Sequence, residues 1–241
     1  MNFGSAISSN AAIHQQITNM TIKLYKVDGS PPVRSALMIT ELLKLKYEPV
    51  DVNLMGGENM TPEYLKKNPN HSVPTLDDNG FIVADSHVIL TYLVEKYGQS
   101  QAQLYPKDIA SRATVDQRLF FEATIVFGAI RVFMTSIFAE KATEPSAEVI
   151  QKVNEVYKTL ETYLSNTKFV ALDHLTVADI SCASSVSSLN EVVPIDAKYE
   201  KLTAWFKAVQ NEEWYKKGNA PGLAMYAGFT KSIMESNKGK A

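Results

Sequence analysis

The sequence of 241 residues has a single cysteine, Cys182, so it cannot form a disulfide framework or a cysteine-rich metal site within the chain. It also lacks a strong charge of either sign, because 24 basic and 26 acidic residues leave a formal net charge of −2 at pH 7. Nucleic-acid-binding domains and proteins of acidic membrane surfaces are typically basic. We therefore expect no nucleic-acid partner and no membrane partner. No metal is expected either.

Long hydrophobic runs are lacking as well. No segment approaches about eighteen uninterrupted apolar residues, so no membrane span is expected. Residues 1–20 contain no lysine or arginine and no apolar core, which fits neither a secretory signal nor an Arg-rich mitochondrial presequence. We interpret 1–20 as a flexible polar extension, with Met20 as an alternative start, and expect the protein in the cytoplasm.

The pattern from residue 21 onwards alternates between strand and helix. The expected strands are 21–27, 48–54, 75–77 and 81–84, and the expected helices are 33–46, 62–67 and 86–97. Asp78-Asn79-Gly80 is a strong hairpin-turn signal between the last two strands. Strands joined by a helical crossover lie parallel, so the order βαβ, helix, ββα predicts a mixed four-stranded sheet within residues 21–100.

Beyond residue 100 the patterns are helical. Residues 101–106 are interpreted as a polar linker, and the expected helices after it are 108–139, 148–164, 177–189, 201–210 and 223–234. Residues 107–241 should therefore form an all-helical bundle with a core of its own, which makes the fold class α/β followed by all-α. Thr176 and Asp179 have the spacing of a capping box, and Cys182 behind it should be buried and inert.

Ser30 precedes Pro31 and Pro32 at the expected start of the first helix. A hydroxyl at a helix N-terminus can donate to an anion that the helix dipole also favours, and a thiolate placed there has its pKa lowered. A lowering of about two units from about 8.5 would convert a mostly protonated thiol at pH 7 into a mostly ionised one. A simple N-cap is the alternative, and Ser-Pro-Pro alone favours it.

Two further segments of the sheet domain could hold a small peptide-like molecule. Pro74 lacks an N–H and belongs at a strand start, and a cis bond before it would present the backbone of Val73 to an extended ligand. Ser86 at a helix N-terminus can bind a carboxylate, while Asp85 can pair with an ammonium. An ordinary turn and a plain capping pair are the alternatives.

The order and spacing of these motifs resemble the cytosolic glutathione transferases, and within them the insect epsilon class, with the delta class as neighbour. The resemblance spans roughly residues 21–234 and rests on segments 30–35, 65–76, 85–89, 104–108 and 175–180. It implies a thioredoxin-like N-terminal domain that binds glutathione, a helical domain that holds an apolar electrophile, and a homodimer.

The resemblance also implies residue roles. Ser30 would be the catalytic hydroxyl that stabilises the glutathione thiolate, and Asp85 stands where many members have Glu. Asn59 stands where some epsilon members have His, near the glycyl carboxylate. The implied glutathione contacts are Asn59, His71, Ser72, Val73, Pro74, Asp85, Ser86, His87 and Arg131.

A stripe of apolar residues on the long helix suits the electrophile, although core packing is the usual reason for such a stripe. Arg131 breaks this face, and a charge there needs a partner. The expected electrophile pocket comprises Pro32, Val73, Phe127, Ile130, Arg131, Met134, Phe138, Leu223 and Tyr226.

The function implied is conjugation of glutathione to apolar electrophiles, with dehydrochlorination or peroxide reduction as side activities in detoxification and insecticide resistance. A non-catalytic carrier of glutathione or an apolar ligand on the same fold is one alternative. A dedicated glutathione transferase of steroid hormone synthesis is another, but that branch places an acidic residue where Ile130 aligns.

Overall fold

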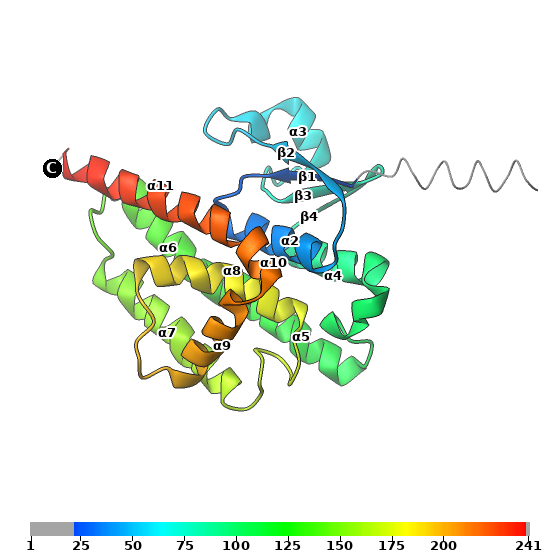
Figure 1. The fold of residues 1–241 in the computed structure, drawn as a ribbon. Helices are drawn as coiled ribbons and strands as arrows, with labels where there is room; N and C mark the ends of the chain where they lie inside the picture. The colour runs from blue at the N-terminus through cyan, green and yellow to red at the C-terminus, as the bar shows by residue number, and fades with distance from the viewer. Residues whose placement is uncertain (1–21, 240–241) are drawn as a thin grey trace, which may run out of the picture.

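The computed structural model describes residues 22–239. The first part of the chain contains a mixed sheet, which lies beneath α3 in Figure 1. Its strands are β1 (Ile22–Lys26), β2 (Tyr47–Asp51), β3 (Thr75–Asp78) and β4 (Phe81–Ala84). The order is β2-β1-β3-β4, with β1 parallel to β2 and antiparallel to β3, which is itself antiparallel to β4. The predicted mixed four-stranded sheet is confirmed, whereas the predicted extension 1–20 lies outside the described residues.

The helices of this half lie on both faces of the sheet. They are α2 (Pro31–Leu42), α3 (Pro62–Lys67) and α4 (Ser86–Tyr97), with the short 3₁₀ helix η1 (Glu58–Met60) before α3. In Figure 1, α3 covers one face, while α2 and α4 lie between the other face and the helical half. The first helix was predicted as 33–46, but α2 ends at Leu42. The predicted C-terminal end is wrong because Lys44 adopts a left-handed φ of 54°, which a helix does not continue through.

The hairpin between β3 and β4 turns where the sequence predicts. Asn79 and Gly80 have positive φ values of 55° and 90°, as the two central residues of a tight type I′ turn require. Phe81 and Tyr92 stack beside this hairpin, with ring centroids 5.1 Å apart. The hairpin therefore places an aromatic pair on the outer edge of the sheet.

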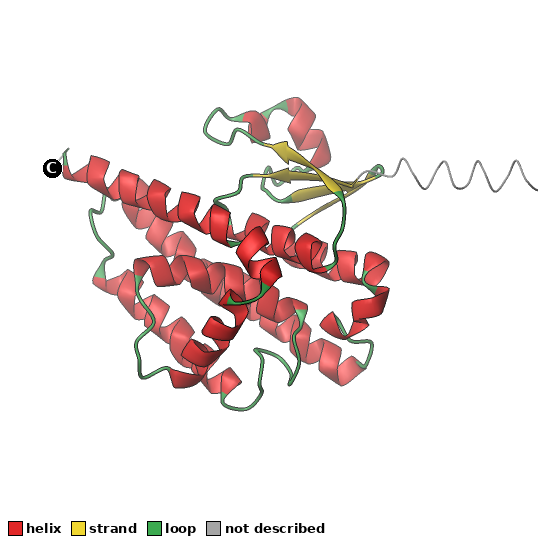
Figure 2. Cartoon of the chain, viewed as in Figure 1, coloured by secondary structure: helices red, strands yellow, loops and turns green. Residues whose placement is uncertain are grey.

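Helices make up the second half of the chain (Figure 2). After the 3₁₀ helix η2 (Gln99–Leu104) come α5 (Ile109–Phe121), the π-helical segment η3 (Glu122–Val126), α6 (Phe127–Phe138), α7 (Ala147–Leu164), α8 (Val177–Val192), α9 (Glu200–Gln210), α10 (Glu213–Gly218) and α11 (Ala220–Lys238). Helix 108–139 of the sequence prediction is thus continuous but contains a π turn. The prediction missed α10, whose six residues are too few to show a helical period.

Helix α8 is the centre of the helical half, and its residues from Val177 to Leu189 are all buried. Cys182 is fully buried, as predicted, and burial raises the pKa of its thiol well above the ordinary value. The carboxylate of Asp179 accepts from the Thr176 amide at 2.9 Å and from the Trp205 indole N–H at 3.0 Å. The predicted capping box therefore also anchors α9 to α8.

One helical segment of the described chain, Ile109–Phe138, is long and apolar enough to cross a membrane by length and composition. Core helices of soluble proteins pass the same test. Here Val115, Phe133 and Ile137 belong to the shared hydrophobic core. Core packing thus explains part of its apolar composition, while Phe120 and Ile125 of the same segment are exposed.

Candidate functional site

Ser30 is the N-cap residue of α2, yet its hydroxyl makes no capping hydrogen bond. A capping hydroxyl accepts from the amide of N2 or N3, and here N2 is Pro32, which has no N–H. The Ser30 amide donates to Val27 O at 2.9 Å, and the Ser30 carbonyl accepts from the Arg34 amide at 3.0 Å. The backbone is therefore fixed, while the hydroxyl has no partner within residues 22–239.

The turn before Ser30 is packed closely by α11. A Cβ added to Gly222 would lie 2.1 Å from the Asp28 carbonyl oxygen, so only glycine allows this approach. On the other side, Lys26 forms ion pairs with Asp28 at 2.7 Å and Asp51 at 2.6 Å. These contacts fix the turn that positions the Ser30 hydroxyl.

The Val73–Pro74 bond is cis, as the resemblance implied, and Val73 is half-buried. The preceding Ser72 carbonyl accepts from the Tyr64 hydroxyl at 2.8 Å and from the Asn68 amide at 2.9 Å. The backbone N–H and C=O of Val73 itself have no hydrogen-bond partner in the described part of the chain. The segment is thus held from behind and leaves Val73 free to pair with a ligand backbone.

His71 and Asn59 lie next to this segment. His71 is exposed and has a left-handed φ of 47°. The Asn59 side-chain amide donates to the His71 carbonyl at 2.8 Å. Asn59 therefore supports the backbone of the loop, and its amide N–H is engaged at the position where the sequence predicts a ligand contact.

Asp85, rather than Ser86 as the sequence suggested, is the N-cap residue of α4. Its Oδ1 accepts from the amides of His87 at 2.9 Å and Val88 at 3.3 Å. Oδ2 and the buried Ser86 hydroxyl have no partner among the residues described. Burial raises the pKa of the Asp85 carboxyl, but the hydrogen bonds and charge of His87 outweigh it and hold the pKa below its ordinary value.

His87 contacts two carboxylates. Its Nδ1 lies 3.0 Å from Asp85 Oδ1, and its Nε2 lies 2.5 Å from Glu122 Oε2 in the π turn η3. Ser181 and Ser185 of α8 donate to the same Glu122 carboxylate. Because both ring nitrogens are engaged, the His87 side chain joins α4 to the helical half, and its predicted contact with glutathione stays a prediction.

The protonation state of His87 follows from this arrangement. Burial lowers the pKa of the imidazole, but hydrogen bonds to Asp85 and Glu122, together with their negative charges, raise it to about 9. The ring is therefore an imidazolium at neutral pH. One cation thus lies between two carboxylates at the start of α4.

The predicted electrophile stripe is divided by burial. Phe127 and Met134 are half-buried, and Phe138 is 37% exposed with its ring centroid 5.8 Å from that of Phe229 on α11. Ile130 is only 2% exposed and belongs to the core. Part of the stripe is therefore accessible to a ligand, and Ile130 is not.

The accessible face of α11 also differs from the prediction. Tyr226 is 4% exposed, and its ring lies 5.9 Å from the guanidinium carbon of Arg34, so it packs in the interior. Met225 and Phe229 are exposed instead, while Leu223 and Pro32 are half-buried. The four-residue spacing of Met225 and Phe229 indicates that the two lie on one face of α11. The sequence alone did not show whether that face or the face with Tyr226 packs against the core.

Arg131 is exposed on α6 and makes no hydrogen bond or ion pair within the part of the chain that the structure describes. It borders a cavity of about 280 Å³ near the connection from α6 to α7. Thr135, Glu140 and Glu148 also line this cavity. Arg131 therefore lies at the edge of the apolar stripe, next to acidic side chains.

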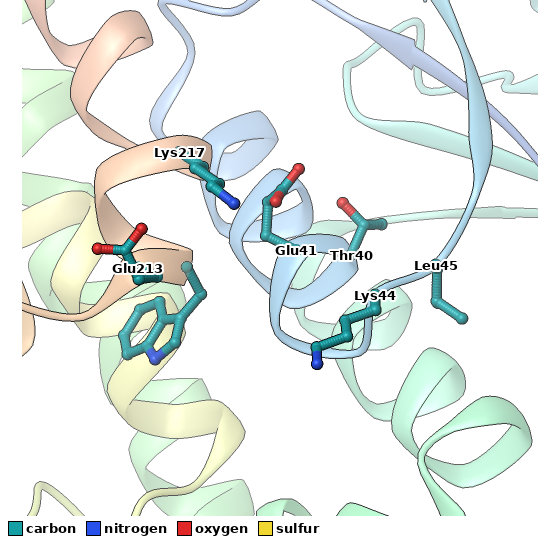
Figure 3. Close-up of a pocket in the computed structure, with 7 residues that line it drawn as sticks. Thr40, Glu41, Lys44, Leu45, Glu213 and Lys217 are labelled. Atoms are coloured by element: carbon teal, nitrogen blue, oxygen red, sulfur yellow. The ribbon is translucent and has the colours of Figure 1, made fainter.

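Two more cavities lie elsewhere. One of about 430 Å³ lies beside Asp85 and His87 and is bordered by Val88 and Phe120 on α4 and α5. The other, of about 380 Å³, lies between the end of α2 and α10, at the opposite end of α2 from Ser30 (Figure 3). Among residues 22–239, no group of three His, Cys, Asp or Glu side chains could hold a metal ion.

Comparisons with known proteins identify the family of this chain. The family model of the glutathione S-transferase N-terminal domain matches residues 24–101, and that of the C-terminal domain matches residues 121–213. Glutathione S-transferase 1 of Manduca sexta is 44% identical over 206 residues, covering 84% of this chain and 94% of that protein. The chain belongs to the glutathione S-transferase family. The predicted enzyme class, a transferase, is confirmed with it.

Solved structures of insect glutathione S-transferases have the same fold. An epsilon-class enzyme from the housefly, Musca domestica, superimposes with a TM-score of 0.85 at 42% identity, covering 88% of this chain and 98% of that one. A homologue from Drosophila mojavensis, solved with bound glutathione, has a TM-score of 0.84 at 42% identity, covering 89% and 98%. The predicted fold class and the resemblance to the epsilon class are confirmed.

Proposed function

We propose that this glutathione S-transferase ionises the thiol of glutathione at Ser30 and transfers the thiolate to apolar electrophiles. The observation that carries the proposal is the Ser30 hydroxyl, which lies at the N-terminus of α2 without a capping partner. The hydroxyl donates to the sulfur, and the helix dipole favours its negative charge. The glutathione bound to the Drosophila mojavensis homologue supports the choice of co-substrate.

The remaining contacts orient the tripeptide. The free backbone groups of Val73, beside Pro74, pair with the cysteinyl residue. Asp85 Oδ2 accepts from the γ-glutamyl ammonium, and the Ser86 hydroxyl donates to the adjacent carboxylate. His71 and Ser72 approach the glycyl end, with Asn59 supporting the loop. At the γ-glutamyl end, this assignment matches the charges of the ligand to Asp85 Oδ2 and the Ser86 hydroxyl, which have no partner within residues 22–239.

In the reaction the thiolate attacks an electrophilic carbon, the S–C bond forms, and the leaving group departs with its electron pair. The proton lost from the thiol passes to solvent. Phe127, Met134, Phe138 and Phe229 supply the apolar wall, with Pro32, Val73 and Leu223 at its edge and Arg131 at its rim. The same thiolate can act as a base in dehydrochlorination or attack a peroxide, and both suit detoxification and insecticide resistance.

We expect the enzyme in the cytoplasm.

A conjugation assay with a chloronitrobenzene tests the role of Ser30. Ser30→Ala should lower kcat/KM about 100-fold, because one hydrogen-bond donor to the developing anion is lost. Thr40→Val, which removes a hydroxyl from the far end of the same helix, is the matched control and should keep kcat/KM within about twofold of the wild type. Unchanged activity in Ser30→Ala would contradict the assigned role. Glutathione binding without turnover of any electrophile would favour a carrier.

We further propose a symmetric homodimer formed through β4, α4 and α5. Phe81, Val88 and Phe120 are 53%, 48% and 72% exposed on these elements, and Val88 and Phe120 border one cavity. Clustered exposed apolar side chains are typical of an interface. Sedimentation should show a dimer for the wild type and a monomer for Phe120→Glu. Ile150→Glu on α7 is the control that should stay dimeric, and a monomeric wild type would contradict the proposal.

A further inference from the structure

Arg34 is a buried cation close to Ser30. Its side chain is fully buried between α2, α8 and α11. Nη1 donates to Asn219 Oδ1 at 2.5 Å and to Ser187 Oγ at 3.1 Å, and Nη2 donates to Ser188 Oγ. The Nε proton has no partner within the described chain. Neutral oxygens thus accept every hydrogen bond that the guanidinium makes.

No carboxylate within residues 22–239 forms an ion pair with Arg34. The Asp28 carboxylate, at the turn above it, pairs with Lys26 instead. Glu191 acts on Arg34 only through space and is exposed near the end of α8. Tyr215 and Tyr226 also face Arg34, but burial raises the pKa of both phenols, so they are neutral. The guanidinium therefore has no balancing negative charge in contact.

Arg34 remains charged despite its burial. Desolvation lowers its pKa, partly offset by Tyr215, Tyr226 and Glu191, to about 10, so the guanidinium is protonated at neutral pH. A buried charge without an opposite charge is costly, and apolar side chains of similar size often give more stable proteins. Stability alone therefore does not explain a cation at this place.

The position of Arg34 relates it directly to Ser30. The two residues are one helical turn apart, and the Arg34 amide donates to the Ser30 carbonyl at 3.0 Å. A Cβ added to Gly222 would lie 2.1 Å from the Asp28 carbonyl oxygen and 2.7 Å from Arg34 Cδ. The arginine stem thus lies beneath the turn that presents the Ser30 hydroxyl, on the side away from solvent.

We propose that Arg34 supplies a fixed, buried positive charge that stabilises the glutathione thiolate through space, so that the bound sulfur is the missing counter-charge of this cation. The proposal rests on the function proposed for Ser30. Arg34 does not touch the sulfur and is a positioning residue in the electrostatic sense: it sets the local potential, while Ser30 makes the hydrogen bond. Because Arg34 is buried in surroundings of low dielectric constant, salt screens the electrostatic potential of its charge only weakly.

The test measures the pKa of the thiol of bound glutathione from the ultraviolet absorbance of the thiolate across pH. Two variants remove the net charge in different ways. Arg34→Met deletes the cation, and Asn219→Asp keeps the side-chain size while giving Arg34 a carboxylate partner. Each variant should raise the thiol pKa by about one unit. At pH values below the thiol pKa of both the wild type and the variant, kcat/KM should fall about tenfold. The loss should disappear at high pH, where the thiol ionises in every variant.

Two further variants separate charge from packing. Arg34→Lys keeps the charge but loses the forked hydrogen bonds, and Ser188→Ala removes one acceptor. Both should lower the thermal midpoint of unfolding yet leave the thiol pKa within about 0.3 units of the wild type. If Arg34 were merely structural, Asn219→Asp would raise the thermal midpoint of unfolding, because the new ion pair would hold Arg34 more firmly. The thiol pKa would then stay at the wild-type value.

Folded Asn219→Asp and Arg34→Met with a wild-type thiol pKa would overturn the proposal. If Arg34→Met does not fold, the nearly isosteric Asn219→Asp decides alone. Ser30→Ala in the same assay keeps the two proposals distinguishable. A raised pKa in Ser30→Ala with unchanged pKa values in the charge variants would contradict only the role of Arg34, and the reverse result would contradict only the role of Ser30.

Discussion

The N-termini of α2 and α4 begin with opposite electrostatics. At α2 the first side chain is the neutral Ser30, without a capping bond, and the buried cation of Arg34 follows one helical turn later. At α4 the first side chain is the carboxylate of Asp85, and two carboxylates flank the single imidazolium of His87. The first terminus favours an anion and the second a cation. The difference suits a ligand with a thiolate at one position and an ammonium at another.

The largest expected effect at the second terminus is on stability. The pKa of His87 is raised to about 9 from an ordinary value near 6.5. Because the folded pKa lies above the unfolded one, this stabilisation is fully present below about pH 6.5 and is lost as the pH rises through about 9. The free energy of unfolding should therefore fall by about 3 kcal/mol over this range, as measured by urea denaturation.

His87→Gln is the matched variant for this measurement, because it keeps a side-chain donor and has no proton to lose. Its free energy of unfolding should lack most of the pH slope between pH 6.5 and 9. The same slope in both proteins would show that the Asp85–His87–Glu122 contact does not store the stability assigned to it.

A smaller effect is expected from Asp85→Asn, which removes the negative charge of the second terminus. Asparagine also caps helices well, so α4 should form normally. The KM for glutathione should rise about tenfold with kcat nearly unchanged, because a charged contact made equally in the ground state and the transition state is lost. A fall in kcat at constant KM would instead mean that Asp85 acts on the sulfur and that the two termini are not separate in function.

The smallest expected effect lies in the apolar wall beyond the first terminus. Phe138→Ala removes one ring of the pair with Phe229 and should raise the KM for an apolar electrophile about threefold, with the KM for glutathione unchanged. Ile150→Ala, an exposed apolar side chain on α7, should change neither value. An equal effect of both variants would remove the Phe138–Phe229 pair from the proposed pocket.

Much of the fold could be predicted because its signals are local. The Asp-Asn-Gly turn, the alternation in β1 and the Thr176–Asp179 capping box each depend on residues that are close in sequence. The end of α2 could not be placed from the sequence, since the helical spacing of apolar residues continues past Lys44. The helical backbone conformation stops before Lys44. The π turn η3 was also missed, and the partners of its Glu122 side chain lie far away in sequence.

The candidate site divides in the same way. The motifs that carry Ser30, the Val73–Pro74 segment and Asp85 could be found from the sequence, as could the cis bond through the family resemblance. The partners of His87 and Arg34 could not, because Glu122 and Asn219 lie 35 and 185 residues away along the chain. The buried state of Ile130 and Tyr226 likewise depends on which helix face meets the core, and that requires the packing of distant helices.

A crystal structure of this protein with bound glutathione tests the contrast between the two helix termini most directly. We expect the sulfur within about 3.5 Å of the Ser30 hydroxyl oxygen and the ammonium of the γ-glutamyl end at Asp85 Oδ2. A tripeptide bound in the reverse direction, or with its sulfur out of hydrogen-bonding reach of Ser30, would contradict this expectation.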